Sequence, residues 1–190
     1  MARTILGAFV APFHKEAAII GRLLAGYTTL EVGLMNCVQV VRDDFDTVLK
    51  AMFRARGETA RIDIADAFGR HYYAQHTLGT EFEMAVGAVR YCLRIRNQFA
   101  HCVWYDDKSG KLALANLEEI AKGNAHVGNL NDLTIFHVDE PLLTDQEAYF
   151  VYADKLLAWV NHEGRQQTGT IRTNPLTKPK QPTQPPLHLP

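Results

Sequence analysis

The sequence predicts a mainly all-α fold, a helical bundle of about six helices with a small β-hairpin insertion before the last helix. Two observations predict this class. Apolar residues recur with a helical period over most of residues 13–101, and β-prone segments around a turn follow at 102–116. The chain has 190 residues, 47% of them hydrophobic, which is enough for one domain with a sizeable core.

The helices before the insertion are predicted in order from their periodicity and their caps. One helix follows Pro12, and the next repeats apolar residues every three to four positions. A third lies between Asp43 or Asp44, as the N-cap, and Gly57, while a T-x-x-E capping box at Thr80 opens the last of this series. The other four are expected over residues 13–25, 27–41, 61–76 and 80–101.

The rest of the chain is predicted as a β-rich insertion, a last helix and a tail. The insertion covers about 102–141, with a hairpin around "DDKSG" and a third short strand in 133–141. A second T-x-x-E box at Thr144 predicts the start of the last helix, so that the helical domain covers 1–164. Residues 165–190 hold six of the eight prolines and no aromatic residue, which predicts a disordered, solvated tail, or else a basic RNA-binding arm.

Composition and charge limit the classes of function, but they do not exclude an RNA enzyme, which needs only a local basic site. The formal net charge is -1, so bulk charge indicates neither a nucleic-acid nor a membrane partner. The three cysteines form no C-x-x-C pair, which favours reduced thiols in a cytoplasmic protein. No uninterrupted apolar run approaches about 20 residues, so no transmembrane helix is expected. No metal-ligand cluster, phosphate-binding glycine loop or serine nucleophile motif occurs, so no cofactor and no metal are expected.

One position breaks the pattern of the helix at 80–101. On a wheel of about 100° per residue, Arg96 falls inside the apolar arc, while Asn97 and His101 share its border. A buried charge is costly unless it is paired or hydrogen-bonded. Glu31, which borders the apolar stripe of 27–41, is the best candidate partner. A buried Arg96–Glu31 pair would be structural, whereas a partly open cleft would let Arg96 bind an anion.

The letters around Arg96, "LRIRNQFAH", resemble the R-polar-x-x-x-H signature of the HEPN superfamily. The match is closest to the R-N-x-F-A-H form of mannitol operon repressor-like and uncharacterised bacterial HEPN proteins. This resemblance implies an all-α bundle that forms a homodimer, with a composite site made of Arg96, Asn97 and His101 from both copies. It also implies that an acidic residue on an earlier helix supports the site, and Glu31 matches that residue by position.

The resemblance implies two alternative functions. In the first, the protein is a metal-independent endoribonuclease of the toxin or phage-defence kind, which cleaves RNA through the 2′-hydroxyl and is paired with an antitoxin. His101 would accept a proton and Arg96 would stabilise the charged phosphate. In the second, the chain is a non-catalytic HEPN-like regulator of transcription or a protein-interaction module, similar to the mannitol repressor, in which the motif is structural.

A second arginine and histidine must be weighed against this motif. "RHYYAQH" places Arg70 and His76 with five residues between them, but it lacks the asparagine and the flanking L-R-x-R-N. We therefore favour Arg96 and His101 as the site. Trp104 is expected to pack the hairpin against the bundle, with base stacking as the lesser alternative.

Overall fold

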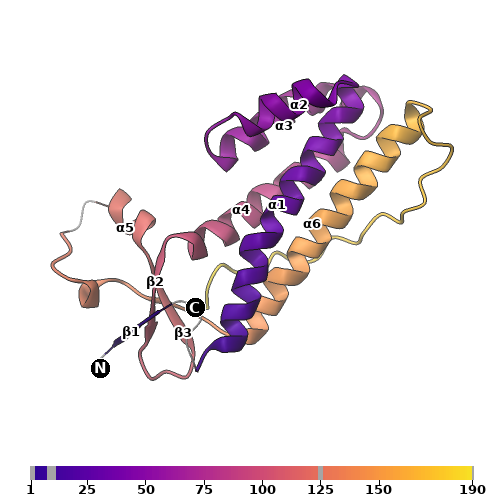
Figure 1. Cartoon of the computed structure of the whole chain (residues 1–190). Helices are drawn as coiled ribbons and strands as arrows, with labels where there is room; N and C mark the ends of the chain where they lie inside the picture. The colour runs from indigo at the N-terminus through magenta and orange to yellow at the C-terminus, as the bar shows by residue number, and fades with distance from the viewer. Residues whose placement is uncertain (1–2, 8–11, 124–125, 190) are drawn as a thin grey trace. The chain divides into compact units, whose positions relative to one another are not determined.

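The fold was analysed in a computed structural model, which describes residues 3–7, 12–123 and 126–189. Within them the chain forms six α-helices and a four-stranded antiparallel sheet whose last three strands precede the last helix (Figure 1). The mainly helical class with a small β insertion is therefore confirmed. The chain divides into two compact units. Unit 1 comprises residues 1–25, 94–148 and 184–190, and unit 2 comprises residues 26–93 and 149–183.

The first helix, α1, runs unbroken from His14 to Arg42, where the sequence predicted two helices. The predicted break lay at Gly26, but a lone glycine only weakens a helix, and no proline ends this one. By length and composition α1 could also cross a membrane, yet core helices of water-soluble proteins pass the same test, and 44% of its most apolar window is buried.

Helices α2 (Phe45–Phe53), α3 (Glu58–Gln75) and α4 (Gly79–Ala100) lie close to the predicted ranges. Asp44 is the N-cap of α2, because its carboxylate accepts a hydrogen bond from the backbone N–H of Thr47 at 3.1 Å. This confirms one of the two predicted caps.

The sheet has the strand order β1-β2-β3-β4, and every neighbouring pair is antiparallel. The predicted hairpin is confirmed as β2 and β3, and the predicted third strand as β4. The fourth strand, β1, was not predicted, because three residues are too few to show a period of two. The strands are β1 (Thr4–Leu6), β2 (Cys102–Asp106), β3 (Leu112–Asn116) and β4 (Phe136–Val138).

Unit 1 has a small core behind this sheet, centred on Tyr105, Ala113 and Ala115, each fully buried. The hydroxyl of Tyr105 donates to the carbonyl of Leu130 at 2.8 Å, so the buried hydroxyl has a hydrogen-bond partner. A short helix, α5 (Leu117–Lys122), follows β3. It was missed because its six residues carry no buried side chain and hence no apolar period.

The last helix, α6, runs from Glu140 to Gln167 and begins four residues before its predicted start at Thr144. The cap is Asp139, whose carboxylate accepts from the backbone N–H of Leu142 at 3.0 Å. Thr144 lies inside the helix and donates to the carbonyl of Glu140 at 2.8 Å, so the predicted capping box is wrong. Pro141 is the second residue of the helix, and a proline is tolerated there because the first four N–H groups of a helix have no acceptor within it.

Helices α1 and α6 contact each other in parallel with a constant offset within each unit. In unit 1, Arg22 donates to Glu147, 125 residues away. In unit 2, Asn161 donates to the carbonyl of Asn36 at 2.8 Å, again 125 residues away. Gly33 allows a close approach there, since a Cβ on it would lie 3.1 Å from Cδ1 of Leu157. The offset between the paired residues is 125 positions in each unit.

Unit 2 also packs α3 against α4. Gly69 faces the buried ring of Phe82, and a Cβ at Gly69 would overlap Cζ of that ring. The ring of Tyr73 stacks on Phe82 with centroids 4.5 Å apart, and its hydroxyl donates to the carbonyl of Cys37 at 2.9 Å. The lack of a side chain at Gly69 therefore leaves the space that the stacked rings of Tyr73 and Phe82 need.

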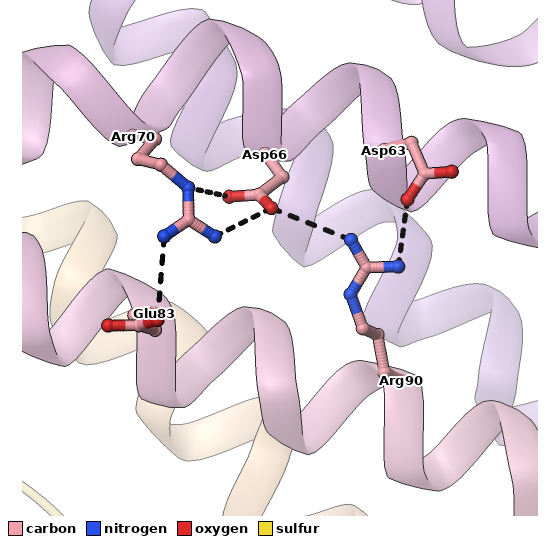
Figure 2. Close-up of polar contacts among 5 residues, drawn as sticks. All are labelled: Asp63, Asp66, Arg70, Glu83 and Arg90. Carbon is pink, nitrogen blue, oxygen red and sulfur yellow. Dashed lines mark hydrogen bonds and ion pairs between the residues drawn. The ribbon is translucent and has the colours of Figure 1, made fainter.

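The surface of the same two helices carries an ion-pair network (Figure 2). Asp66 sits at its centre, because its carboxylate contacts Arg70 at 2.8 Å and Arg90 at 3.5 Å. Arg90 also pairs with Asp63 at 2.8 Å, and Arg70 with Glu83 at 3.4 Å. The charges of the three carboxylates and two guanidinium groups nearly cancel, so the network leaves little net charge to bind a ligand. We interpret it as a structural link between α3 and α4.

The described residues of the proline-rich segment, for which the sequence predicts a disordered tail, make polar contacts within each unit. In unit 2, Asn174 donates to the carboxylate of Glu163 at 2.8 Å, and the ammonium of Lys178 pairs with Glu81 at 2.9 Å and lies over the ring of Trp159. In unit 1, Pro185 is buried. The compositional argument missed these polar and cation–π contacts, which need no apolar core.

Candidate functional site

Arg96 and Asn97 lie in the last turn of α4, in unit 1. The Nη1 of Arg96 donates to the side-chain oxygen of Asn97 at 3.0 Å, so the two predicted residues are joined directly. Both side chains are half-buried, whereas Ile95 and Phe99 are 0% and 3% exposed. Arg96 thus lies within the angular range of the buried stripe, as the wheel predicted, but its own side chain is only half-buried. The stripe is wider than the wheel predicted, since Ile95 is buried as well.

His101 is the first residue after α4, and its side chain is exposed. Its backbone carbonyl accepts a hydrogen bond from the N–H of Leu117 at 2.8 Å, which ties the end of α4 to the start of α5. The residue lines an open hollow of about 550 Å³ together with Cys102 and Glu118. An exposed imidazole beside an open hollow is accessible to a substrate, as proton transfer requires.

Asn116 is a positioning residue that the sequence analysis missed. Its side-chain N–H donates to the backbone carbonyl of Asn97 at 3.2 Å. Its side-chain oxygen accepts from the backbone N–H groups of Glu118 and Glu119 at 2.9 and 3.1 Å, which caps α5. The "NLEE" stretch is a recognisable N-cap signal, but no pattern in the sequence reveals the contact with Asn97.

Glu31, the predicted supporting residue, lies in unit 2 and is 5% exposed. Its two carboxylate oxygens accept hydrogen bonds from Nη1 of Arg61, at 2.9 and 3.1 Å. Arg61 is therefore the partner of Glu31, where the sequence predicted Arg96. Periodicity could not find this pair because it does not show which helix packs against which.

The second arginine and histidine, in unit 2, are occupied by neighbours. Arg70 belongs to the ion-pair network with Asp66 and Glu83 (Figure 2). The ring of His76 stacks on Tyr72 with centroids 4.1 Å apart, and its Nδ1 lies 2.8 Å from the carbonyl of that residue. These contacts give both residues structural roles and favour the pair Arg96 and His101.

An apolar cavity of about 250 Å³ lies next to the hollow and shares Ala100 and Cys102 with it. Phe99 and Trp104 line it, with their rings stacked at a centroid distance of 6.1 Å. The thiol of Cys102 donates to the carbonyl of Phe99 at 3.2 Å, and burial raises its pKa to about 12. Such a thiol stays protonated at neutral pH, so we assign Cys102 a structural role.

No group of three or more metal-ligating side chains occurs in the part of the chain that the structure describes. What unit 1 offers at the end of α4 is a guanidinium, an amide and an imidazole. A guanidinium can bind a phosphate in a fixed geometry, and an imidazole can exchange protons near neutral pH.

Comparisons with protein-family models, with curated proteins and with solved structures gave no match to this chain. The resemblance to HEPN proteins therefore rests on the residues of "LRIRNQFAH" and on the helical class of the fold.

Proposed function

We propose that the chain is a HEPN-like endoribonuclease that cleaves RNA without a metal ion. The observation that carries the proposal is the hydrogen bond from Arg96 to Asn97, which orients a guanidinium in the last turn of α4, just before the exposed His101. Oriented donors stabilise developing charge better than mobile ones do. These residues and their spacing are those of the motif that the sequence shares with HEPN proteins.

The proposed reaction needs only the RNA and these side chains. His101 accepts the proton of the 2′-hydroxyl while that oxygen attacks the adjacent phosphorus. Arg96 binds the phosphate oxygens as negative charge develops on them. The bond to the 5′-oxygen then breaks, and this leaving oxygen takes up a proton. The products are a 2′,3′-cyclic phosphate and a 5′-hydroxyl, so no redox step and no bound cofactor enter the scheme.

The partners and the location follow from the same proposal. Two copies would form a homodimer, so that the motifs of both contribute to one composite site. An antitoxin or another regulatory protein would restrain the nuclease in the cytoplasm, as in toxin–antitoxin and phage-defence systems. The thiols Cys37, Cys92 and Cys102 are free, which is consistent with a reducing compartment.

A second candidate is a non-catalytic HEPN-like regulator or interaction module. The hydrogen bonds of Asn97 favour this candidate. The side-chain oxygen of Asn97 accepts from Arg96, and its backbone carbonyl accepts from Asn116. In this alternative "RNQFAH" is a hydrogen-bonded junction between α4 and the sheet, and it performs no chemistry.

RNA cleavage in the presence of EDTA separates the two candidates. Purified wild-type protein is expected to cut RNA and to leave 2′,3′-cyclic phosphate ends, while His101→Ala and Arg96→Ala lose at least about 100-fold in rate. His71→Ala, which removes another exposed histidine, is the matched control and should cut normally. Expression in a bacterial host should follow the same order of toxicity. If wild type and His101→Ala are equally inert, the nuclease is refuted and the regulator remains.

Light scattering tests the composite site. A nuclease with a shared site must be at least a dimer at working concentrations. A strictly monomeric protein that still cleaves RNA would contradict the dimeric arrangement while leaving the roles of Arg96 and His101 intact.

A further inference from the structure

The last residues of the chain bind unit 1 mainly through their backbone. Gln146 in α6 is 0% exposed, and its side-chain Nε2 donates to the carbonyls of Pro186 and Leu187 at 2.8 and 3.0 Å. A single buried amide thus holds two consecutive peptide carbonyls. Contacts of this kind recognise an extended backbone and depend little on its side chains.

The same segment contacts β4 through one backbone hydrogen bond and one ring contact. The backbone N–H of Leu189 donates to the carbonyl of His137 at 2.8 Å, and the ring of His188 stacks on Phe136 with centroids 4.1 Å apart. On its other side β4 pairs with β3. An extended segment that adds to a free strand edge is the arrangement found in β-strand addition. We call Phe136, His137 and Gln146 the Gln146 face.

Two features indicate that the resident segment can be exchanged. It forms no regular helix or strand of its own, so it is held by the Gln146 face and not by internal structure. The side-chain Oε1 of Gln146 is buried with no hydrogen-bond partner among the described residues, and Pro186 has no N–H to donate to it. A buried acceptor without a donor costs free energy, so the resident segment does not satisfy the face fully.

We propose that the Gln146 face is a recognition site for extended proline-rich peptides, and that residues 185–189 occupy it as a tethered resident ligand. The partner in trans is a protein segment of similar chemistry, with two adjacent prolines followed by apolar residues. Backbone contacts to Gln146 and His137 supply affinity. The buried side chain of Pro185 and the ring stacked on Phe136 supply selectivity. This site is separate from Arg96 and His101 and does not depend on the proposed nuclease.

The covalent link between residues 185–189 and the rest of the chain determines how tightly a free peptide can bind the Gln146 face. A segment linked to its own site acts at an effective concentration on the order of millimolar. A free peptide must displace it, so the intact chain binds partners weakly until the resident segment is loosened. The proposal therefore predicts a closed state and an open state of one face.

The test uses the full chain and a labelled peptide, QPTQPPLHLP, in fluorescence anisotropy. An opened variant, Pro185→Gly with His188→Ala, weakens the resident segment and leaves the face untouched. We expect it to bind the peptide at least tenfold more tightly than the wild type does, and severalfold more tightly than it binds a scrambled peptide. Equal binding by wild type and opened variant, or no binding by either, would overturn the proposal.

Two further variants in the opened background test the face itself. Gln146→Ala should abolish peptide binding, and Phe136→Ala should weaken it severalfold by removing the ring contact. Gln146 is buried, so its loss could unfold the chain, and circular dichroism must show a native melting transition. Phe136 is 36% exposed and tolerates truncation better. Unchanged peptide binding by a folded Phe136→Ala variant and a folded Gln146→Ala variant would place the peptide elsewhere and refute the assignment.

Discussion

Arg61 holds the buried carboxylate of Glu31 with one guanidinium nitrogen, at 2.9 and 3.1 Å from its two oxygens. The side chain of Glu31 is 6% exposed and that of Arg61 is 24% exposed, so the acid is the more deeply buried partner. The guanidinium also lies over the ring of Phe53, 5.2 Å from its centre. This pair fixes the start of α3 against α1 within unit 2.

Arg61→Ala is expected to destabilise the protein by about 3 kcal/mol, because it leaves the buried carboxyl of Glu31 without its partner. Urea unfolding measures the loss. Arg56→Ala removes a nearby exposed arginine and should change stability by less than about 0.5 kcal/mol. Adding Glu31→Gln to Arg61→Ala should recover part of the loss. A full loss that persists in the double variant would mean that packing of Arg61, and not its charge, is what matters.

Gly69→Ala is expected to destabilise unit 2 by about 1–3 kcal/mol, since the new Cβ would overlap the buried ring of Phe82. Gly87→Ala is the matched control. It lies in the interior of α4, is exposed, and has no atom within 4 Å of the added Cβ, so it should stabilise by about 0.5–1 kcal/mol. Thermal melts should show a lower melting temperature for Gly69→Ala and a higher one for Gly87→Ala. Two shifts in the same direction would contradict the close packing of Gly69 against Phe82.

The acid stability of unit 1 should depend on Asp107. Hydrogen bonds from Ser109 and His137 lower the pKa of this carboxyl to about 2. Because the folded pKa lies below the unfolded value of about 3.9, the stabilisation is complete above pH 4 and is lost as the pH falls toward 2. We expect a contribution of about 1–2 kcal/mol.

Urea unfolding of the wild type and of Asp107→Asn between pH 2 and pH 6 measures this contribution. The two proteins should converge in stability at the acid end of the range. A constant difference across the whole range would show that Asp107 contributes through neutral hydrogen bonds alone.

The alkaline stability of unit 2 should depend on Cys37, because burial raises the pKa of its thiol to about 12. The folded pKa lies above the unfolded value of about 8.5, so the thiol stabilises the fold fully below pH 8.5 and progressively less as the pH rises toward 12. We expect the wild type to lose about 1–2 kcal/mol more than Cys37→Ala between pH 8 and pH 10. Parallel curves for the two proteins would contradict the burial of this thiol.

Asn116 should control both the stability of α5 and the position of the motif. Asn116→Asp keeps the N-cap of α5 but loses the hydrogen bond to the carbonyl of Asn97. Asn116→Ala loses both and should cost about 1–2 kcal/mol. If the nuclease proposal holds, both variants cut RNA more slowly at unchanged pH dependence. Normal cleavage by a folded Asn116→Asp variant would show that the contact with Asn97 does not position the site.

The helical class and most helix limits could be predicted because capping and apolar periodicity are local signals. Asp44 is one example, since the residues it caps follow directly in the chain. The partner of Glu31 could not be predicted, because which arginine faces it depends on how α3 packs on α1. Asn116 was missed for the same reason, as its contact with Asn97 joins residues 19 positions apart. The ordered path of the proline-rich segment depends on Gln146, 40 residues upstream of Pro186.

The parallel pairing of α1 with α6 has a consequence during synthesis. Lys15 and Glu140, like Arg22 and Glu147, are 125 residues apart in the chain. At about 5–20 residues per second, a ribosome needs roughly 6–25 s to make the second member of such a pair after the first. For that time the side of α1 that contacts α6 has no final partner, although its contacts with α3 can already form. We expect nascent chains to keep that side of α1 bound to a chaperone until the last helix emerges.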